Sequence, residues 1–298
     1  AMDRHKKQEL RKESLDRTRR EMLAERAAAL ARITRTLERQ LSRLHRMRRD
    51  IPTILGPKRK KHLATYAALR DKGCPVHVLD TAASPGPRDG VTWFQGDVRS
   101  HADVRAACAG VDTVFHTAAV IEALTHARRE VVDAVESINV GGTENLIRVA
   151  RETGATRLVH TGSIVAAFCM DAAGSDESAP YSSSRDLYTS TKIAGERAVL
   201  DANGERGLLT CVIRPGGIYG PGERFTYGRL VRALKMGIPL VVFGDGSARL
   251  DYVYIDNLVD AQLRAAERLV EGSPVCGQAY FLSDETPINA GQFSIELA

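Results

Sequence analysis

The sequence predicts an α/β fold, a doubly wound parallel sheet with helices on both faces. After residue 50, short runs of β-branched and apolar residues alternate with amphipathic helical stretches, as parallel strands linked by helices do. All 25 glycines and all 11 prolines lie in that region, where turns are needed. The chain has 298 residues, 43% of them hydrophobic, which is enough to bury a core. We expect two domains, a helical arm at residues 1–50 and an α/β body at residues 51–298.

Residues 1–50 are predicted to form a basic α-helical arm. Helix-breaking Gly and Pro are absent there, and Arg, Glu, Leu and Ala are frequent. Leucine or isoleucine recurs every seven residues, which is typical of a coiled-coil seam. These positions are Leu23, Leu30, Leu37, Leu44 and Ile51. The arm is expected to pack on its own domain, to form a homo-oligomer or to dock a protein partner, and these alternatives remain open.

The net charge of +5 does not predict nucleic-acid binding, because the excess is confined to the arm. Residues 1–50 carry 16 Lys and Arg against 8 Asp and Glu (+8), which leaves 26 against 29 (−3) in the rest. The arm also lacks aromatic residues. No apolar run approaches the roughly 20 residues of a membrane span. Five scattered cysteines without a paired C-x-x-C favour a cytoplasmic location, and the eight histidines show no metal-ligand spacing.

The body contains the strands and helices of the predicted sheet. Strands are expected at residues 76–79, 91–94, 113–116, 157–160 and 208–213, and helices at 102–109, 140–153 and 187–202. Thr53–Leu55 is expected as a shortened first strand. Because ligands of such sheets bind at the carboxyl ends of the strands, the residues directly after each strand are the candidate ligand contacts.

Three strand ends suggest a dinucleotide site. Asp80 ends the strand at 76–79, where a carboxylate accepts from adenosine ribose hydroxyls and repels a 2′-phosphate, favouring NAD over NADP. Asp97 follows the next strand and is placed to accept from an adenine amino group. The small residues at 117–119 let a flat cofactor approach the backbone. Aspartates at strand ends are also ordinary turn residues, which is the competing interpretation.

Tyr188 and Lys192 form the strongest catalytic pattern. Residues four apart lie one turn from each other on a helix. The pKa of a phenol is about 10, so tyrosine is a poor base at neutral pH unless a nearby ammonium stabilises the phenolate. Tyr188 can then move a proton to or from a substrate hydroxyl. Ser163, just after the strand at 157–160, is placed to hydrogen-bond the same oxygen, and Asn139 at a helix start adds weight.

Longer motifs then carry a family resemblance. The segments are Asn139–Leu146 (NVGGTENL), Leu187–Lys192 (LYTSTK) and Arg214–Gly220 (RPGGIYG), supported by residues 247–258, 277–281 and 287–289. With these motifs, residues 76–298 resemble the extended short-chain dehydrogenases/reductases, and within them the 3β-hydroxysteroid dehydrogenase family. The resemblance implies a Rossmann-type fold and hydride transfer between a C–OH group and NAD.

The resemblance also implies a role for each matching residue. Tyr188 would be the acid/base, Lys192 would lower its pKa and bind the nicotinamide ribose, and Ser163 would orient the substrate oxygen. Asn139 would support the lysine through a water. The residues implied to contact NAD are Asp80, Asp97 and Val98 at the adenosine half, Thr117, Ala118 and Ala119 along the cofactor, and Lys192, Pro215 and Gly216 at the nicotinamide.

The chain departs from the family pattern at three places. The glycine-rich phosphate loop is reduced to Gly56, and Lys58–Lys61 stand in its place, so either these charges neutralise the pyrophosphate or cofactor binding is lost. A further interpretation is that residues 1–62 are not the native start of this domain. Gly162 stands where the family often has a second hydroxyl residue. The chain ends at Ala298, so the substrate-binding portion at residues 214–298 is expected to be truncated.

The sequence therefore predicts an NAD-dependent oxidoreductase that interconverts a secondary alcohol and a ketone on a small hydroxy or keto substrate. A nucleotide-sugar epimerase or reductase on the same fold is the enzymatic alternative. The alternative of another class is a non-catalytic docking protein, because the phosphate loop is degenerate.

Overall fold

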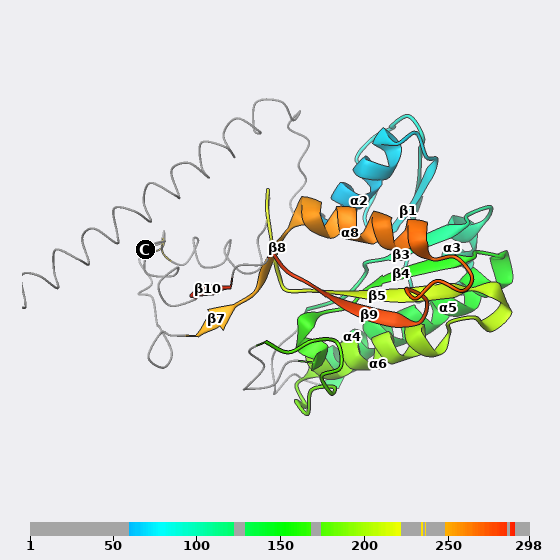
Figure 1. Cartoon of the computed structure of the whole chain (residues 1–298). Coiled ribbons are helices and arrows are strands. Elements are labelled where there is room, and N and C mark those ends of the chain that lie inside the picture. Colours follow the sequence, from blue (N-terminus) through cyan, green and yellow to red (C-terminus); the bar gives the residue numbers. More distant parts are fainter. Residues whose placement is uncertain are drawn as a thin grey trace, which may run out of the picture. The chain divides into compact units, whose positions relative to one another are not determined.

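The computed structural model describes residues 60–121, 129–167, 174–221, 234, 236, 248–284 and 287–289 (Figure 1). The chain divides into two units at residues 1–57 and 58–298, and only the second contains described residues. The predicted arm, the heptad positions and the strand at Thr53–Leu55 therefore lie outside the described residues.

The described elements follow the α/β order that the sequence predicts. The first half comprises α2 (Lys60–Asp71), β1 (Val76–Asp80), β2 (Val91–Gln95), α3 (His101–Cys108), β3 (Thr113–His116), α4 (Arg129–Glu136), the π-helical turn η1 (Ser137–Gly141) and α5 (Gly142–Thr153). The second comprises β4 (Arg157–Thr161), η2 (Ile164–Ala167), α6 (Leu187–Asp201), η3 (Glu205–Gly207), β5 (Leu209–Pro215), β6 (Gly217–Tyr219), β7 (Arg249–Leu250), β8 (Tyr252–Tyr254), α8 (Ile255–Arg268), β9 (Gln278–Leu282) and β10 (Ile288–Asn289). The five predicted strands and three predicted helices are thus confirmed to within two residues at each end.

The main strands form two parallel groups. β1 pairs with β2, and a second group has the order β3-β4-β5-β9, with every neighbouring pair parallel. Two short pairs, β6 with β8 and β7 with β10, lie outside these groups. The predicted parallel sheet is therefore confirmed, and within the four-stranded group α-helices connect each strand to the next, as parallel pairing requires.

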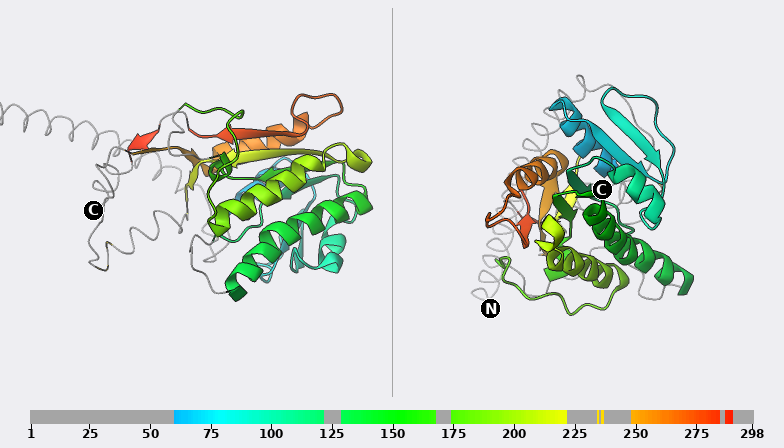
Figure 2. Two further views of the ribbon diagram at one scale, coloured as in Figure 1. Left: turned by 90° about the horizontal axis from the view of Figure 1, so that it is seen from below. Right: turned by 90° about the vertical axis from the view of Figure 1, so that its right-hand side faces the viewer.

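Helices cover both faces of the four-stranded group (Figure 2). On one face, Leu158 of β4 and Val212 of β5 pack in a core with residues of α3, α5 and α6. On the other face, the next residue in β4, Val159, packs with residues of α8. Strands buried on both faces are typical of doubly wound sheets, so this part of the prediction is confirmed.

Helix boundaries follow local capping chemistry. Ser100 caps α3 by accepting from the main-chain N–H of Asp103, and Asp186 caps α6 by accepting from Thr189. α5 ends at Thr153 and is capped by Gly154, whose φ of 79° lies in the left-handed region that favours glycine. The cap at Asp186 fixes where α6 begins and therefore where Tyr188, its second residue, is presented.

The two strand groups are held together from both faces. α3 packs on β1 and β2 and also on α5. On the other face, α2 packs on α8, and Thr65 of α2 donates to Oε1 of Gln262 at 3.2 Å. The amide of Gln262 donates in turn to Thr161 Oγ1 at 2.7 Å, at the end of β4. A polar chain thus runs from α2 to the strand end that precedes Ser163.

Candidate functional site

The predicted site residues lie at the carboxyl ends of the parallel strands. Asp80 ends β1, Asp97 and Val98 follow β2, and Thr117–Ala119 follow β3. Ser163 follows β4, Pro215 ends β5, and Gly216 comes directly after it. Tyr188 and Lys192 lie in α6 and Asn139 lies in η1. This is where a doubly wound sheet places its ligand.

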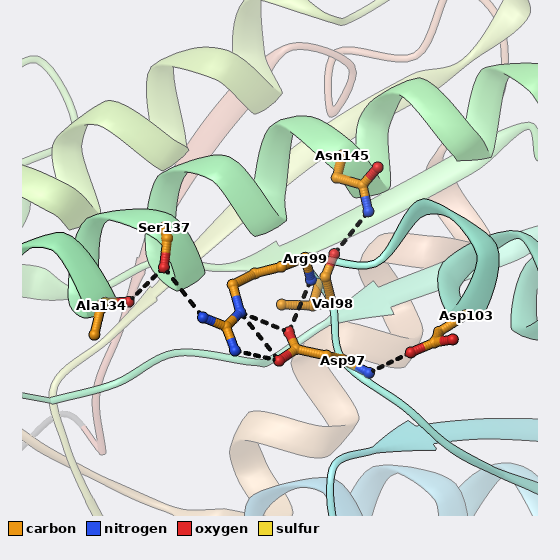
Figure 3. Close-up of polar contacts among 7 residues, drawn as sticks. All are labelled: Asp97, Val98, Arg99, Asp103, Ala134, Ser137 and Asn145. Atoms are coloured by element: carbon orange, nitrogen blue, oxygen red, sulfur yellow. Dashed lines mark hydrogen bonds and ion pairs between the residues drawn. The ribbon is translucent and has the colours of Figure 1, made fainter.

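The loop after β2 is fixed by contacts from α3 and α5 (Figure 3). The main-chain N–H of Asp97 donates to Asp103 Oδ2 at 2.9 Å, and Asn145 Nδ2 donates to the Val98 carbonyl at 2.8 Å. Val98 also packs on Gly142, where an added Cβ would lie 2.5 Å from Val98 Cγ1. The backbone of residues 97 and 98 is therefore held before any ligand arrives.

Asn139 joins two parts of the site. It is 4% exposed, its Oδ1 accepts from the Val120 N–H at 2.8 Å, and its Nδ2 donates to the Val120 carbonyl at 3.0 Å. The same Nδ2 donates to Thr191 Oγ1 at 3.1 Å. Asn139 thereby ties the loop after β3 to α6, one residue before Lys192. It does so from a π-helical turn, which is a frequent feature of functional sites.

Tyr188 and Ser163 meet at the end of β4. Burial raises the pKa of Tyr188, and its hydrogen bond with Ser163 lowers that pKa by a smaller amount. The charge of Asp186 adds to the rise. The net direction is upward, opposite to the direction expected from a lysine one turn away. The difference arises because the sequence does not show how deeply the phenol is buried.

Lys192 is 4% exposed and is held by the end of β4. Its Nζ donates to the Thr161 carbonyl at 2.7 Å and lies 3.5 Å from His160 Nε2. Burial first, and then the charge of Lys192, keep the pKa of His160 well below its usual range, so this imidazole is neutral. His160 lies against His116, with ring centroids 4.9 Å apart. A neutral ring can accept a hydrogen bond from the ammonium group.

Sequence reasoning missed His160, and it also missed a buried ion pair between Glu196 and Arg214. The Arg214 guanidinium reaches Glu196 through Nε at 3.0 and 3.1 Å and through Nη2 at 2.5 Å, with both side chains at most 5% exposed. Arg214 directly precedes Pro215, and Glu196 lies one turn after Lys192 on α6. The pair therefore fixes α6 against β5. The Arg-Pro motif and an acid four residues after the lysine were the available signals.

Two glycines of the site allow close backbone approach. A Cβ at Gly216 would lie 2.5 Å from the carbonyl oxygen of Asp251. A Cβ at Gly162 would lie 2.7 Å from Val212 Cγ1 and 3.0 Å from Glu196 Oε2. The packing around Gly162 thus leaves little room for a hydroxyl side chain at this position.

Metal-binding clusters and membrane-spanning helices are both absent from the described part of the chain. No group of His, Cys, Asp or Glu side chains there is arranged to hold a metal ion. Among the same residues, no helix is both long and apolar enough to cross a bilayer.

The parallel fold and the Ser163, Tyr188 and Lys192 arrangement define an extended short-chain dehydrogenase/reductase. Residues 68–298 match the 3-beta hydroxysteroid dehydrogenase/isomerase family, and the chain belongs to that family. The resemblance expected for residues 76–298 is therefore confirmed.

Two curated relatives and one solved structure show the range of likeness. A 3 beta-hydroxysteroid dehydrogenase/Delta 5-->4-isomerase of Mycobacterium tuberculosis (strain ATCC 25618 / H37Rv) is 42% identical over 234 residues, covering 76% of this chain and 62% of the relative. A 3-beta-hydroxysteroid dehydrogenase of Mycolicibacterium neoaurum is 38% identical over 231 residues, covering 76% and 63%. The chain thus spans a little over three fifths of these relatives. A UDP-glucose 4-epimerase of Thermus thermophilus, solved with NAD, shares the fold at a TM-score of 0.65 and 21% identity, covering 80% of this chain and 79% of that one.

Proposed function

We propose that the chain is an NAD-dependent oxidoreductase that interconverts a secondary alcohol and a ketone, with a 3β-hydroxysteroid as the substrate class. The observation that carries the proposal is the placement of Ser163 just after β4, with Tyr188 on α6 and Lys192 one turn further along that helix. Lys192 is buried, and its Nζ donates to the Thr161 carbonyl at the end of β4 at 2.7 Å. The names of the relatives supply the substrate class, since both are 3β-hydroxysteroid dehydrogenases.

The described residues fit NAD by their chemistry. Asp80 supplies carboxylate acceptors for ribose hydroxyls, and a negative charge there disfavours the extra phosphate of NADP. Asp97 supplies an acceptor for the adenine amino group. Lys192 supplies donors for the nicotinamide ribose. The remaining proposed contacts are Val98, Thr117, Ala118, Ala119, Pro215 and Gly216.

In the proposed mechanism, the side chains orient the substrate and transfer the proton, and NAD would accept the hydride when bound. Ser163 orients the substrate oxygen. In alcohol oxidation Tyr188 takes the hydroxyl proton, and in ketone reduction it gives that proton back. Because burial raises the pKa of Tyr188, the phenol is protonated at neutral pH. The ligand-free site is therefore already prepared to donate a proton to a ketone.

The test is turnover with a named steroid probe. Dehydroepiandrosterone and NAD should give NADH, followed by the ultraviolet absorbance of the reduced nicotinamide. Tyr188→Phe should lower kcat by about 10²-fold or more, since general acid–base catalysis contributes about 10²–10⁴-fold, while NAD affinity should stay nearly unchanged. Wild-type NAD binding with no steroid turnover would reject the substrate class, and full activity in the variant would reject Tyr188 as the acid/base.

A nucleotide-sugar epimerase or reductase is the second candidate. The likeness to solved epimerases supports it, but at 21% identity that likeness shows the fold alone. Conversion of UDP-glucose in the presence of NAD, with no oxidation of the steroid, would favour this candidate. Failure of the wild type to bind NAD would favour the non-catalytic docking protein.

We also propose that residues 1–50 form a separate arm that mediates self-association or docks a protein partner. The support is the heptad spacing from Leu23 to Ile51 and the change of composition at residue 50. Sedimentation of the whole chain and of a variant lacking residues 1–50 tests this, because an unchanged oligomeric state would remove the self-association idea. Free thiols at the four described cysteines support a reducing, cytoplasmic location.

A further inference from the structure

The Arg99 side chain forms a fork on the carboxylate of Asp97 (Figure 3). Its Nε lies 3.0 Å from both Oδ1 and Oδ2, and its Nη2 donates to Oδ2 at 2.5 Å. The main-chain N–H of Arg99 donates to Oδ1 at 2.9 Å. A planar guanidinium that meets both carboxylate oxygens fixes the plane of that carboxylate as well as its charge.

The other end of the guanidinium lies close to η1. Arg99 Nη1 lies 3.5 Å from Ser137 Oγ, and the Ser137 hydroxyl donates to the Ala134 carbonyl at 2.9 Å. Ser137 precedes Asn139 by two residues in the same turn. The guanidinium is thus placed between the loop after β2 and the turn that carries Asn139.

Asp97 keeps capacity for a further partner. A carboxylate offers about four acceptor positions, and three donor groups of Arg99 already meet this one, namely the main-chain N–H, Nε and Nη2. One position is left for a further donor, and the side chain of Asp97 is 30% exposed. The backbone of the loop is held independently, by Asp103 on the Asp97 N–H and by Asn145 on the Val98 carbonyl. Loss of the Arg99 side chain should therefore leave the carboxylate held only by the main-chain N–H of residue 99, with the loop backbone still in place.

We propose that Arg99 is a positioning residue for the adenine end of the dinucleotide site. By fixing the orientation of the Asp97 carboxylate, Arg99 makes the site select a purine that carries an amino group. This inference rests on the proposed function, in which Asp97 accepts from the adenine amino group. The lowered pKa of Asp97, caused first by its hydrogen bond with Arg99, agrees with a carboxylate kept ionised as an acceptor.

The choice of base separates positioning from a general structural effect. Adenine presents an amino donor where hypoxanthine presents a carbonyl oxygen. A fixed carboxylate accepts from the first and repels the second, so the ratio of the two affinities reports its orientation. A variant that merely loosens the fold weakens both ligands together and leaves the ratio unchanged.

The experiment measures the affinity of the full chain for NAD and for nicotinamide hypoxanthine dinucleotide by titration calorimetry. The wild type should prefer NAD by about tenfold or more, as expected for one hydrogen bond to a charged group. Arg99→Ala should lower that ratio by at least about threefold. Arg99→Lys keeps the charge but loses the two-pronged contact, so its ratio should lie between those of the wild type and Arg99→Ala. Asp97→Asn should lower the ratio further, and adding Arg99→Ala to it should change little more.

Arg105→Ala is the matched control, because Arg105 is an exposed arginine of α3 that pairs with Glu152 at 3.4 Å. It removes the same charge and should leave the ratio unchanged. A wild type that binds NAD without preferring it overturns the inference alone. So does an Arg99→Ala ratio equal to that of the wild type, or a higher NAD affinity in that variant. A wild type that binds neither dinucleotide overturns the proposed function together with the inference.

Discussion

Ser163 lowers the pKa of Tyr188 through a hydrogen bond, which opposes the larger rise in pKa caused by burial. Removal of this bond in Ser163→Ala should raise the pKa of Tyr188. Alcohol oxidation needs the phenolate, so its rate increases with pH as Tyr188 loses its proton. The rising limb of the pH profile of kcat should therefore move to higher pH, and kcat should fall because the substrate oxygen is less well oriented.

Ser190→Ala serves as the control for this shift. Ser190 is an exposed residue of α6, and its hydroxyl donates to the Leu187 carbonyl at 3.1 Å. Its loss should leave the limb in place. A limb that moves to lower pH in Ser163→Ala, or stays fixed, would contradict the role assigned to this hydrogen bond.

Gly162 is constrained by its neighbours and not by its backbone angles. In Gly162→Ser the new Cβ would press on Val212 Cγ1 at 2.7 Å and on Glu196 Oε2 at 3.0 Å. Overpacking of this kind lowers the free energy of unfolding by about 1–3 kcal/mol. Gly141→Ala is the control, since a Cβ there meets nothing within 4 Å. Urea unfolding should place Gly141→Ala at or above the wild type, and equal stability of Gly162→Ser and the wild type would refute the packing account.

Among the elements, α6 and β5 depend on the buried pair of Glu196 and Arg214. Glu196→Gln removes the negative charge and leaves a buried guanidinium without its counter-charge. Breaking a buried pair in this way lowers the free energy of unfolding by about 3–5 kcal/mol. Asp260→Asn is the control, because it breaks the exposed pair with Arg264 on α8, for which about 0.5 kcal/mol or less is expected. Equal losses in the two variants would show that the buried pair is not what holds α6 to β5.

Sequence patterns predicted the elements well because each depends on nearby residues. The short apolar run within 157–160 involves neighbouring positions, and the cap at Asp186 joins residues only three apart. Contacts between distant residues were not predictable in the same way. Thr65 and Gln262 meet across 197 positions, and His116 lies opposite His160 only because of the register of β3 and β4.

The same limit applies to the candidate site. Its members were found from their places after strands and from the four-residue spacing of Tyr188 and Lys192. The burial and hydrogen bonding of these side chains could not be predicted from the sequence, because both depend on how the elements pack. The two clearest examples are the raised pKa of Tyr188 and the ion pair in which Arg99 contacts both carboxylate oxygens of Asp97.

On the scale of the whole molecule, the site draws its residues from several strand ends that helices hold in register. α3 and α5 fix the loop after β2, Asn139 ties the loop after β3 to α6, and Glu196 ties α6 to β5. The expected adenine, ribose and catalytic contacts are thus parts of one connected framework. A dinucleotide that spans this framework should stabilise it as a whole.

The central claim is that this Rossmann fold binds NAD although basic residues at 58–61 stand in place of the glycine-rich loop. Titration of the wild-type chain with NAD tests this claim most directly. We predict saturable binding with one NAD per chain, and a stabilisation of about 2.7 kcal/mol at a ligand concentration about one hundred times Kd. Tyr188→Phe should bind NAD with nearly the same affinity. Saturating NAD that produces neither heat nor a rise in Tm would contradict the account.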